Sequence, residues 1–436
     1  MSASRSLLLP FAIAAALLVA SDAVTAQSGR QGYLERRADE RRDVRGDKIE
    51  EARQNYPDAV RKEPGLRATS RFQRQINAMV KAFEEEDFAK ALELSTAISG
   101  DARANAFEKA VAFQVAGNVA MEQGNDDAAI AAFRSAVESN GLDNNAHFAT
   151  MLNLANVQVQ ADRFEDGIAT LEAMIAESRT QRPDVFAALG SYNFQAERYP
   201  AAAQALEKAI SLADGPRPDW ERLLQKVYFD AGQYAEAARV GERLLAREPD
   251  DKRTLFELAN VYLEMDQADK AIALLEGART RGLLTEARDY QSLYTLYFNA
   301  GEREKEVVAV IEEGLAKGVL KRDLQTLNVL AQAAYFSDDM AKAIAGYTEA
   351  AALDPTGEAG LNLAKVLSGE GEDAKARDAA RAALAKGVSN PGDAWMVIAR
   401  SEALLDNRAG ARAALQEAAK YPQTRDQANR MLQQMR

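Results

Sequence analysis

Residues 255–278 read LFELANVYLEMDQADKAIALLEGA, and this stretch is the clearest indication of the fold. Its first half has the form L-x-x-L-A-x-x-Y, starting at Leu255, with large apolar residues around a small one. After a polar turn, its second half places the small residues Ala271 and Ala278 on either side of Leu275. Two apolar stripes at helical spacing, separated by a turn, predict two antiparallel helices that approach closely where side chains are small.

The same template recurs along the chain. Leu327 begins a second close copy, and Ala343 opens the second half of that copy. The small-residue slot of the second helix returns every 33 to 38 residues, at Ala91, Ala129, Gly167, Ala202, Ala237, Ala271, Val307, Ala343, Ala376 and Ala411. Polar turn pairs such as Gly232-Gln233 and Asp406-Asn407 precede these slots. Self-similarity at such a period indicates a repeat architecture rather than several separate cores.

This pattern resembles the tetratricopeptide-repeat family over about Phe72–Gln423. The resemblance implies an all-α fold, a right-handed superhelix (α-solenoid) of about ten helix-turn-helix repeats. We expect the solenoid to cover residues 71–423 and a capping helix to cover residues 424–436. Ala428, Met431 and Leu432 would lie on the last repeat, with Gln433, Gln434 and Arg436 in water. The seventh repeat, with Val307 and Gly314 in its small slots and one extra residue, is the least regular.

Composition limits the chemistry that the chain can perform. It has no cysteine and one histidine, so thiol catalysis and thiolate metal sites are excluded. The net charge of −12 argues against general nucleic-acid binding. Acid clusters such as Glu84-Glu85-Glu86 fall at predicted turns, where carboxylates are solvated. No stretch outside the repeats is long enough for the catalytic domain of a lytic transglycosylase. We therefore expect no catalytic residue, no metal and no cofactor.

The N-terminus has the features of a secretory signal peptide over residues 1–26. Arg5 supplies a positive charge, Leu7–Ala20 form an apolar stretch of 14 residues, and Val24-Thr25-Ala26 offers small residues for cleavage before Gln27. A membrane anchor is the alternative, but about 20 apolar residues are needed to span a bilayer. The expected location of the mature chain is the periplasm.

Residues 27–70 form a highly charged segment with 11 Lys/Arg and 9 Asp/Glu. It has almost no apolar face to bury, and Pro57 and Pro64-Gly65 interrupt any helix. The composition predicts a solvated, flexible N-terminal tether.

The resemblance places a partner-binding groove on the first helices, at the second, fifth, ninth, twelfth and thirteenth residues of each repeat. Carried over residue by residue, these slots give a candidate groove formed by Asn118, Asn156, Phe194, Arg222, Lys226, Phe229, Phe256, Asn260, Phe298, Asn328, Gln332 and Tyr335. Amide side chains both donate and accept hydrogen bonds, so they suit the backbone of an extended peptide. Aromatic rings suit its apolar side chains. The alternative is that any helix facing water carries polar residues.

Some members of the family bind a C-terminal carboxylate through a lysine with paired asparagines. Here Leu152 occupies the fifth slot beside Asn156. The pattern is therefore incomplete, and we do not expect a C-terminal carboxylate as the ligand.

Four further stretches are more specific than the repeat template: FEEEDFAKA at 83–91, KGVL at 317–320, AKGVSNPG at 385–392 and AAKYPQT at 418–424. They resemble exported repeat proteins encoded beside TonB–ExbB–ExbD components in Gram-negative bacteria. This resemblance implies an adaptor for energy-coupled transport across the outer membrane, with TonB-type or ExbD-type periplasmic segments as partners. A scaffold for envelope biogenesis or polysaccharide export is the alternative. The sequence does not indicate an oligomeric state.

Overall fold

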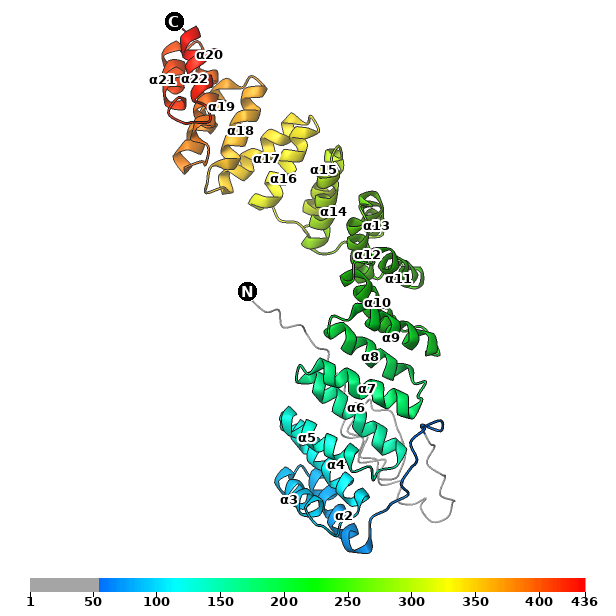
Figure 1. Cartoon of the computed structure of the whole chain (residues 1–436). Coiled ribbons are helices and arrows are strands. Elements are labelled where there is room, and N and C mark those ends of the chain that lie inside the picture. Colours follow the sequence, from blue (N-terminus) through cyan, green and yellow to red (C-terminus); the bar gives the residue numbers. More distant parts are fainter. Residues whose placement is uncertain (1–54, 436) are drawn as a thin grey trace. The chain divides into compact units, whose positions relative to one another are not determined.

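The computed structural model describes residues 55–435, and every regular element in that range is a helix. The chain divides into two compact units, which we call unit 1 (to Gln233) and unit 2 (from Tyr234). The helices of unit 1 are α2 Ser70–Glu84, α3 Phe88–Ser99, α4 Ala106–Glu122, α5 Asp126–Glu138, α6 Asn144–Gln160, α7 Phe164–Ser178, α8 Pro183–Gln195, α9 Tyr199–Leu212 and α10 Pro218–Asp230 (Figure 1).

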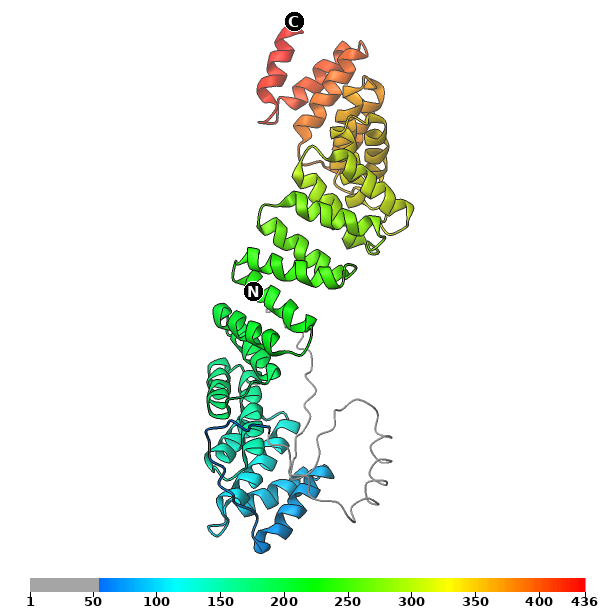
Figure 2. The same ribbon diagram turned by 90° about the vertical axis from the view of Figure 1, so that its right-hand side faces the viewer.

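The helices of unit 2 follow the same alternation. They are α11 Tyr234–Arg247, α12 Lys252–Glu264, α13 Ala268–Thr280, α14 Ala287–Ala300, α15 Glu304–Ala316, α16 Leu324–Phe336, α17 Met340–Leu353, α18 Glu358–Gly369, α19 Asp373–Lys386, α20 Pro391–Leu404, α21 Arg408–Ala418 and α22 Arg425–Gln434. In both units each helix packs against the next, so each unit is a stack of antiparallel helix pairs, as Figure 2 shows from a second side. The prediction of an all-helical solenoid is confirmed for the described residues.

The small-residue slots lie in the buried faces of the second helices. All ten fall within a second helix, and all ten are buried. The alanines among them are at most 1% exposed. Gly167 is the one glycine among them, and a Cβ there would lie 2.5 Å from Val159 Cγ2. Close-packed interiors leave no room for a larger side chain at such positions, which explains the periodic signal in the sequence.

The turns inside the helix pairs, apart from that of α14 and α15, use one recurrent geometry. A residue in the left-handed region follows the first helix, and glycine meets this need at Gly124 (φ 67°) and Gly371 (φ 77°). The next N–H then bonds the carbonyl five residues back, as in Asn125 to Ala120 (2.8 Å). This is a Schellman-type ending, which satisfies a carbonyl that the helix leaves free. The turn pairs identified in the sequence therefore end the first helices.

The seventh pair, α14 and α15, absorbs its extra residue in this turn. Gly301 and Glu302 both have positive φ, at 69° and 55°. The small slots remain filled, because Val307 is fully buried and a Cβ at Gly314 would meet Leu320 at 2.7 Å. The irregularity is thus local, and the stack continues through it.

The last helix covers the end of unit 2. Ala428 of α22 is fully buried, while Met431 and Leu432 pack against the cluster formed by α18 to α21. Thr424 fixes the preceding turn by donating from Oγ1 to the carbonyl of Ala418 (2.7 Å). The exposed Gln433 and Gln434 face solvent, as expected of a polar cap, whereas Arg436 lies outside the described residues.

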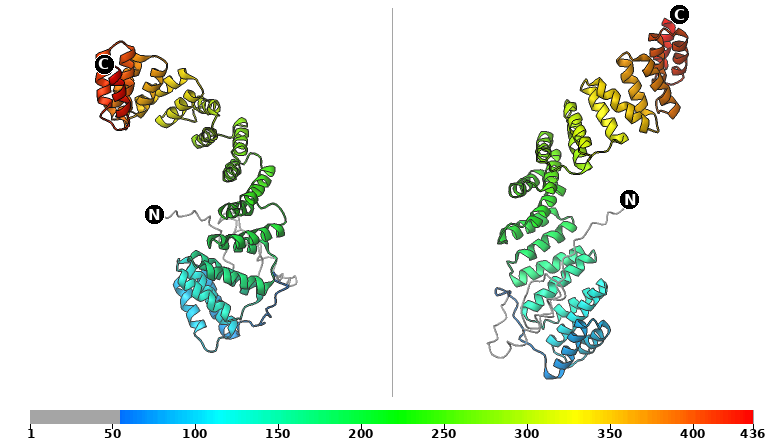
Figure 3. Two further views of the ribbon diagram at one scale, coloured as in Figure 1. Left: turned by 45° about the horizontal axis from the view of Figure 1, so that its top comes forward. Right: turned by 180° about the vertical axis from the view of Figure 1, so that it is seen from behind.

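Residues 55–69, which we call the strap, differ from the solvated tether that their composition favours. The strap lies along unit 1, beside the loops that precede α4, α6 and α8 (Figure 3). Tyr56 is 3% exposed and packs in a cluster with residues of α6, α7 and α8. Thr69 donates from both N and Oγ1 to Glu108 Oε1 (2.7 Å each). Long-range contacts to a folded surface outweigh the local composition here.

The expected signal peptide (1–26) and residues 27–54 of the expected tether lie outside the described residues. Within 55–435, no helix is long and apolar enough to cross a membrane.

Candidate functional site

The first helices pack on the second helices of their own and neighbouring pairs, and three of them also contact the first helix of a neighbouring pair: α2 with α4, α8 with α10, and α18 with α20. The predicted groove slots belong to these helices. The two units use the slots differently.

In unit 1 the groove amides are engaged within the protein. Asn118 of α4 is only 8% exposed. Gln114, one turn before it, donates from Nε2 to Thr150 Oγ1 of α6 (2.6 Å). Asn156 of α6 has an exposed side chain, but its Oδ1 accepts a hydrogen bond from the Tyr192 hydroxyl of α8. Burial raises the pKa of Tyr192 above its ordinary value, so the tyrosine stays a neutral donor.

The structure brings two other groove residues of unit 1 together. Lys226 Nζ of α10 lies 5.5 Å from the centre of the Phe194 ring of α8, within cation–π range. The same ammonium pairs with Asp230 (2.9 Å). Arg222 and Phe229, on the same helix as Lys226, are half-buried. Lys226 thus already has an acidic neighbour on its own helix.

In unit 2 the ninth slot is exposed in five successive first helices, at Asn260, Thr295, Gln332, Lys365 and Arg400. Lys365 pairs with Asp393 (2.9 Å).

Aromatic residues occupy neighbouring groove slots of unit 2. Phe256 and Phe298 are half-buried, and Tyr335 is 43% exposed with its ring 5.4 Å from that of Phe336. Asn328 is half-buried, and its Oδ1 has no hydrogen-bond partner among the described residues. Unit 2 therefore presents accessible polar groups beside partly exposed rings.

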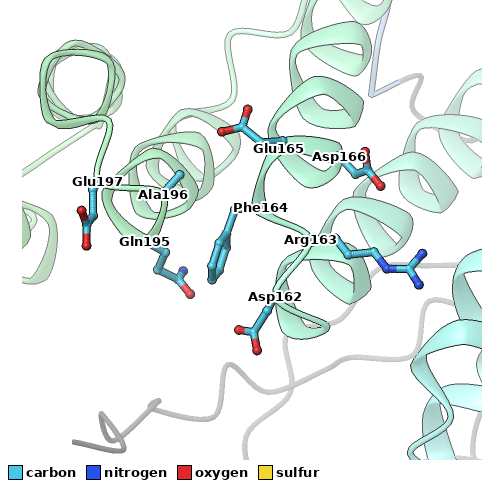
Figure 4. Close-up of a pocket in the computed structure, with 8 residues that line it drawn as sticks. All are labelled: Asp162, Arg163, Phe164, Glu165, Asp166, Gln195, Ala196 and Glu197. Atoms are coloured by element: carbon cyan, nitrogen blue, oxygen red, sulfur yellow. The ribbon is translucent and has the colours of Figure 1, made fainter. Parts of the chain in front are cut away.

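A depression of about 460 Å³ lies at the turns of unit 1, between the α6–α7 and α8–α9 connections. The Phe164 and Gln195 side chains lie next to each other in its lining, and Asp162, Glu165 and Glu197 do not point to a common centre (Figure 4). Arg163 bonds Asp127 of the preceding turn (2.5 Å), and Arg198 bonds Glu165. The carboxylates of Asp127 and Glu165 thus form ion pairs that link neighbouring repeats. Among residues 55–435, no group of three or more acidic, histidine or cysteine side chains could hold a metal ion.

Sequence reasoning missed the surface under the strap. Three asparagines lie in and after the α5–α6 loop, and each accepts a hydrogen bond from the strap: Asn140 and Asn144 from Arg61, and Asn145 from the Asn55 N–H. The stretch SNGLDNN at 139–145 was the available signal, since asparagine clusters favour loops and side-chain hydrogen bonds. Its partner, 90 residues away, could not be found from local patterns.

Comparison with known proteins supports the repeat assignment. Two family models, both described as tetratricopeptide repeat, match residues 152–217 and 228–295. These matches identify tetratricopeptide repeats at residues 152–217 and 228–295 of the all-helical solenoid, and neither matching model describes an enzyme family. A comparison with curated proteins finds no match.

Three solved structures illustrate what this chain is similar to. The MamA protein is 23% identical, covering 41% of this chain and 96% of its own, with a TM-score of 0.35. A tetratricopeptide-repeat protein from Parabacteroides merdae is 16% identical, covering 60% and 98%, with a TM-score of 0.37. The C-terminal part of a repeat-containing protein from Cytophaga hutchinsonii is 17% identical, covering 67% and 98%, also with a TM-score of 0.37.

Proposed function

We propose that this protein is a non-catalytic periplasmic adaptor that binds an extended segment of another protein along the first helices of unit 2. The observation that carries the proposal is the exposure of Asn260 and Gln332 at equivalent slots, with the half-buried Phe298 on the helix between them. Amides can pair with the N–H and C=O groups of an extended backbone, and the ring offers apolar surface to its side chains.

The resemblance of residues 83–91, 385–392 and 418–424 to exported repeat proteins supplies the biological setting. The proposed role is assistance to TonB-dependent, energy-coupled transport across the outer membrane, with a periplasmic segment of a TonB-type or ExbD-type protein as partner. Repeat solenoids present extended surfaces for such segments. A scaffold for envelope biogenesis or polysaccharide export is the second candidate, and gene neighbourhood distinguishes the two.

The proposal is tested by isothermal titration of the mature chain with purified periplasmic segments of a TonB-type and an ExbD-type protein. We expect saturable binding to one of them. Asn260→Ala with Gln332→Ala should weaken it by ~1–3 kcal/mol per side chain. Asn362→Ala, an exposed asparagine of α18 outside the proposed groove set, is the matched control. Absence of binding to both segments by a fully helical protein would reject the transport role.

A further inference from the structure

Residues 55–63 of the strap bind unit 1 in the way a peptide ligand binds a receptor. Tyr56 inserts its ring beside Phe148 of α6, with ring centres 4.9 Å apart in an edge-to-face arrangement. Its hydroxyl accepts a hydrogen bond from Arg182 Nη1 at the start of α8 (3.1 Å). Edge-to-face packing combined with a satisfied hydroxyl is how a buried tyrosine serves as an anchor.

A tight turn follows this anchor. The Ala59 N–H bonds the Tyr56 carbonyl (3.3 Å), and Pro57 occupies the second turn position, where proline is favoured. After the turn, the Val60 N–H donates to the carbonyl of Glu177 at the end of α7 (2.9 Å). The anchor and the turn thus place the next residue, Arg61, over the α5–α6 loop.

The Arg61 guanidinium is held by three oxygens. Nε bonds Asn140 Oδ1 (3.0 Å), Nη1 bonds Asn144 Oδ1 (2.8 Å), and Nη2 bonds the Leu142 carbonyl (2.9 Å). A planar guanidinium with donors in fixed directions suits such a set of acceptors better than a lysine would. This cradle therefore selects for arginine.

Asn144 contacts the strap with every polar group that points away from its helix. Besides accepting from Arg61, its Nδ2 donates to the Arg61 carbonyl (3.3 Å) and its N–H donates to Glu63 Oε1 (3.0 Å). The side chain is 3% exposed. Binding of a backbone carbonyl and a side chain by one buried amide is a feature of peptide recognition.

The connection from the strap to α2 leaves room for release. Gly65 has a φ of +62° with no atom within 4 Å of the Cβ position, and Leu66 is 41% exposed. Residues 67–69 have separate bonds to α4, through the Arg67 carbonyl to Asn105 and through Thr69 to Glu108. Residues 55–63 can therefore leave while the start of α2 stays in place.

We propose that this surface, which we call the edge site (Asn140, Leu142, Asn144, Asn145, Phe148, Glu177 and Arg182), is a second peptide-binding site that the strap fills in cis. Its trans ligand is a partner protein segment with a Tyr-Pro turn and an arginine five residues after the tyrosine. The strap is part of the same chain and therefore competes with that ligand at a high effective concentration. It thereby lowers the apparent affinity of the edge site for the ligand. The edge site is formed by inter-repeat loops and adjoining helix ends, apart from the groove slots.

The test uses a labelled peptide with the sequence of residues 55–64, and fluorescence anisotropy. The receptor is the mature chain carrying Tyr56→Ala and Arg61→Ala, which weaken the cis strap. We expect saturable binding to this opened variant and at least ~10-fold weaker binding to the wild type, because the wild-type strap occupies the site. A peptide with both anchor residues replaced by alanine should not bind.

Adding Asn144→Ala to the opened variant should weaken peptide binding by ~10-fold or more, since the Arg61 cradle and a backbone contact are lost. Asn153→Ala, on the same helix but outside the edge site, is the matched control and should have no effect. An opened, fully helical variant that fails to bind the peptide, or that binds the alanine peptide equally, overturns the proposal.

A second measurement uses the wild-type chain, so it does not depend on how the variants fold. Excess peptide should accelerate hydrogen exchange at residues 55–63 while α6 to α8 remain protected. Unchanged exchange at saturating peptide contradicts displacement. A concentration-dependent dimer that Tyr56→Ala abolishes would assign the site to a second copy of the chain and overturn the partner assignment.

Discussion

Units 1 and 2 are built from the same helix pair, yet they treat the same polar slot in different ways. In unit 1 the slot amides are used internally, because Asn118 is buried and Asn156 accepts from Tyr192. In unit 2 Asn260 and Gln332 occupy the slot and remain exposed. The slot alone therefore does not determine function; a tyrosine on the next first helix converts a possible ligand contact into a link between repeats.

The edges of the units differ as well. Unit 1 has a strap pinned to its inter-repeat loops by Tyr56 and Arg61, whereas in the described part of unit 2 the added element is the cap α22 at its end. An element that crosses several repeats couples them, while a terminal cap stabilises only its neighbour. We therefore expect a substitution in the strap to change the stability of all the repeats of unit 1 that the strap contacts.

The largest expected effect is on the anchor of the strap. Tyr56→Ala should lower the free energy of unfolding of unit 1 by roughly 3 kcal/mol, because a buried ring and its hydrogen bond are lost. Tyr335→Ala, at a half-exposed ring of unit 2, should change stability by less than about 0.5 kcal/mol. Hydrogen exchange resolved by helix measures both. Equal losses of stability in the two variants would contradict this difference between the units.

The next effect concerns the loop that cradles Arg61. A Cβ at Gly141 would lie 2.2 Å from the backbone of Ala106, so Gly141→Ala must displace the loop or the start of α4. We expect a loss of about 2–3 kcal/mol, within the range of overpacked sites. Gly277→Ala in α13 of unit 2 meets no atom within 4 Å and should stabilise by up to about 1 kcal/mol. Chemical denaturation compares them, and a tolerated Gly141→Ala would contradict the close approach.

Between about pH 7 and about pH 5, above the range in which carboxylates take up protons, acidification should weaken unit 1 more than unit 2, which contains no histidine. Burial and the positive charge of Arg61 lower the pKa of His147 from 6.5 to about 4, with the Glu177 carboxylate 4.0 Å away as its acidic neighbour. Because the unfolded chain takes up the proton first, this stability is present above about pH 6.5 and is lost as pH falls toward 4. The expected loss is roughly 2 kcal/mol by about pH 5.

The control for this effect is His147→Gln, whose stability should fall less between about pH 7 and about pH 5. Denaturant midpoints at each pH measure the difference. Parallel curves for the two proteins would show that the histidine does not titrate between the folded and unfolded states.

The smallest expected effect distinguishes a slot amide that stabilises the fold from one that is proposed to bind the partner. Asn156→Ala should cost unit 1 about 1 kcal/mol of stability, since it leaves the buried Tyr192 hydroxyl without its acceptor. Asn260→Ala should leave the stability of unit 2 within about 0.5 kcal/mol and weaken partner binding instead. Thermal melts of both variants measure the change in stability, and binding titrations measure the change in affinity for the partner. A stability loss in Asn260→Ala would assign that amide to the fold.

The helix pairs could be predicted because their signal is local. A slot such as Ala271 tolerates only a small side chain because two helices touch there. The same requirement recurs in each repeat, so it is visible as a period in the sequence. The strap could not be predicted, since Tyr56 lies 92 residues before Phe148 and sits among charges that favour solvent. The engagement of Asn156 was missed for a related reason. It depends on Tyr192, which none of the groove slots includes.

Site-specific photocrosslinking in intact cells tests directly whether a partner binds along the first helices of unit 2. A crosslinking residue is placed at Asn260 on the proposed groove of unit 2, or at Ala273 on the exposed side of α13 as the control. We expect one discrete adduct from position 260, none from position 273, and loss of the adduct when Gln332→Ala is added. Equal adducts from both positions, or an adduct that Gln332→Ala leaves unchanged, would contradict partner binding along the first helices.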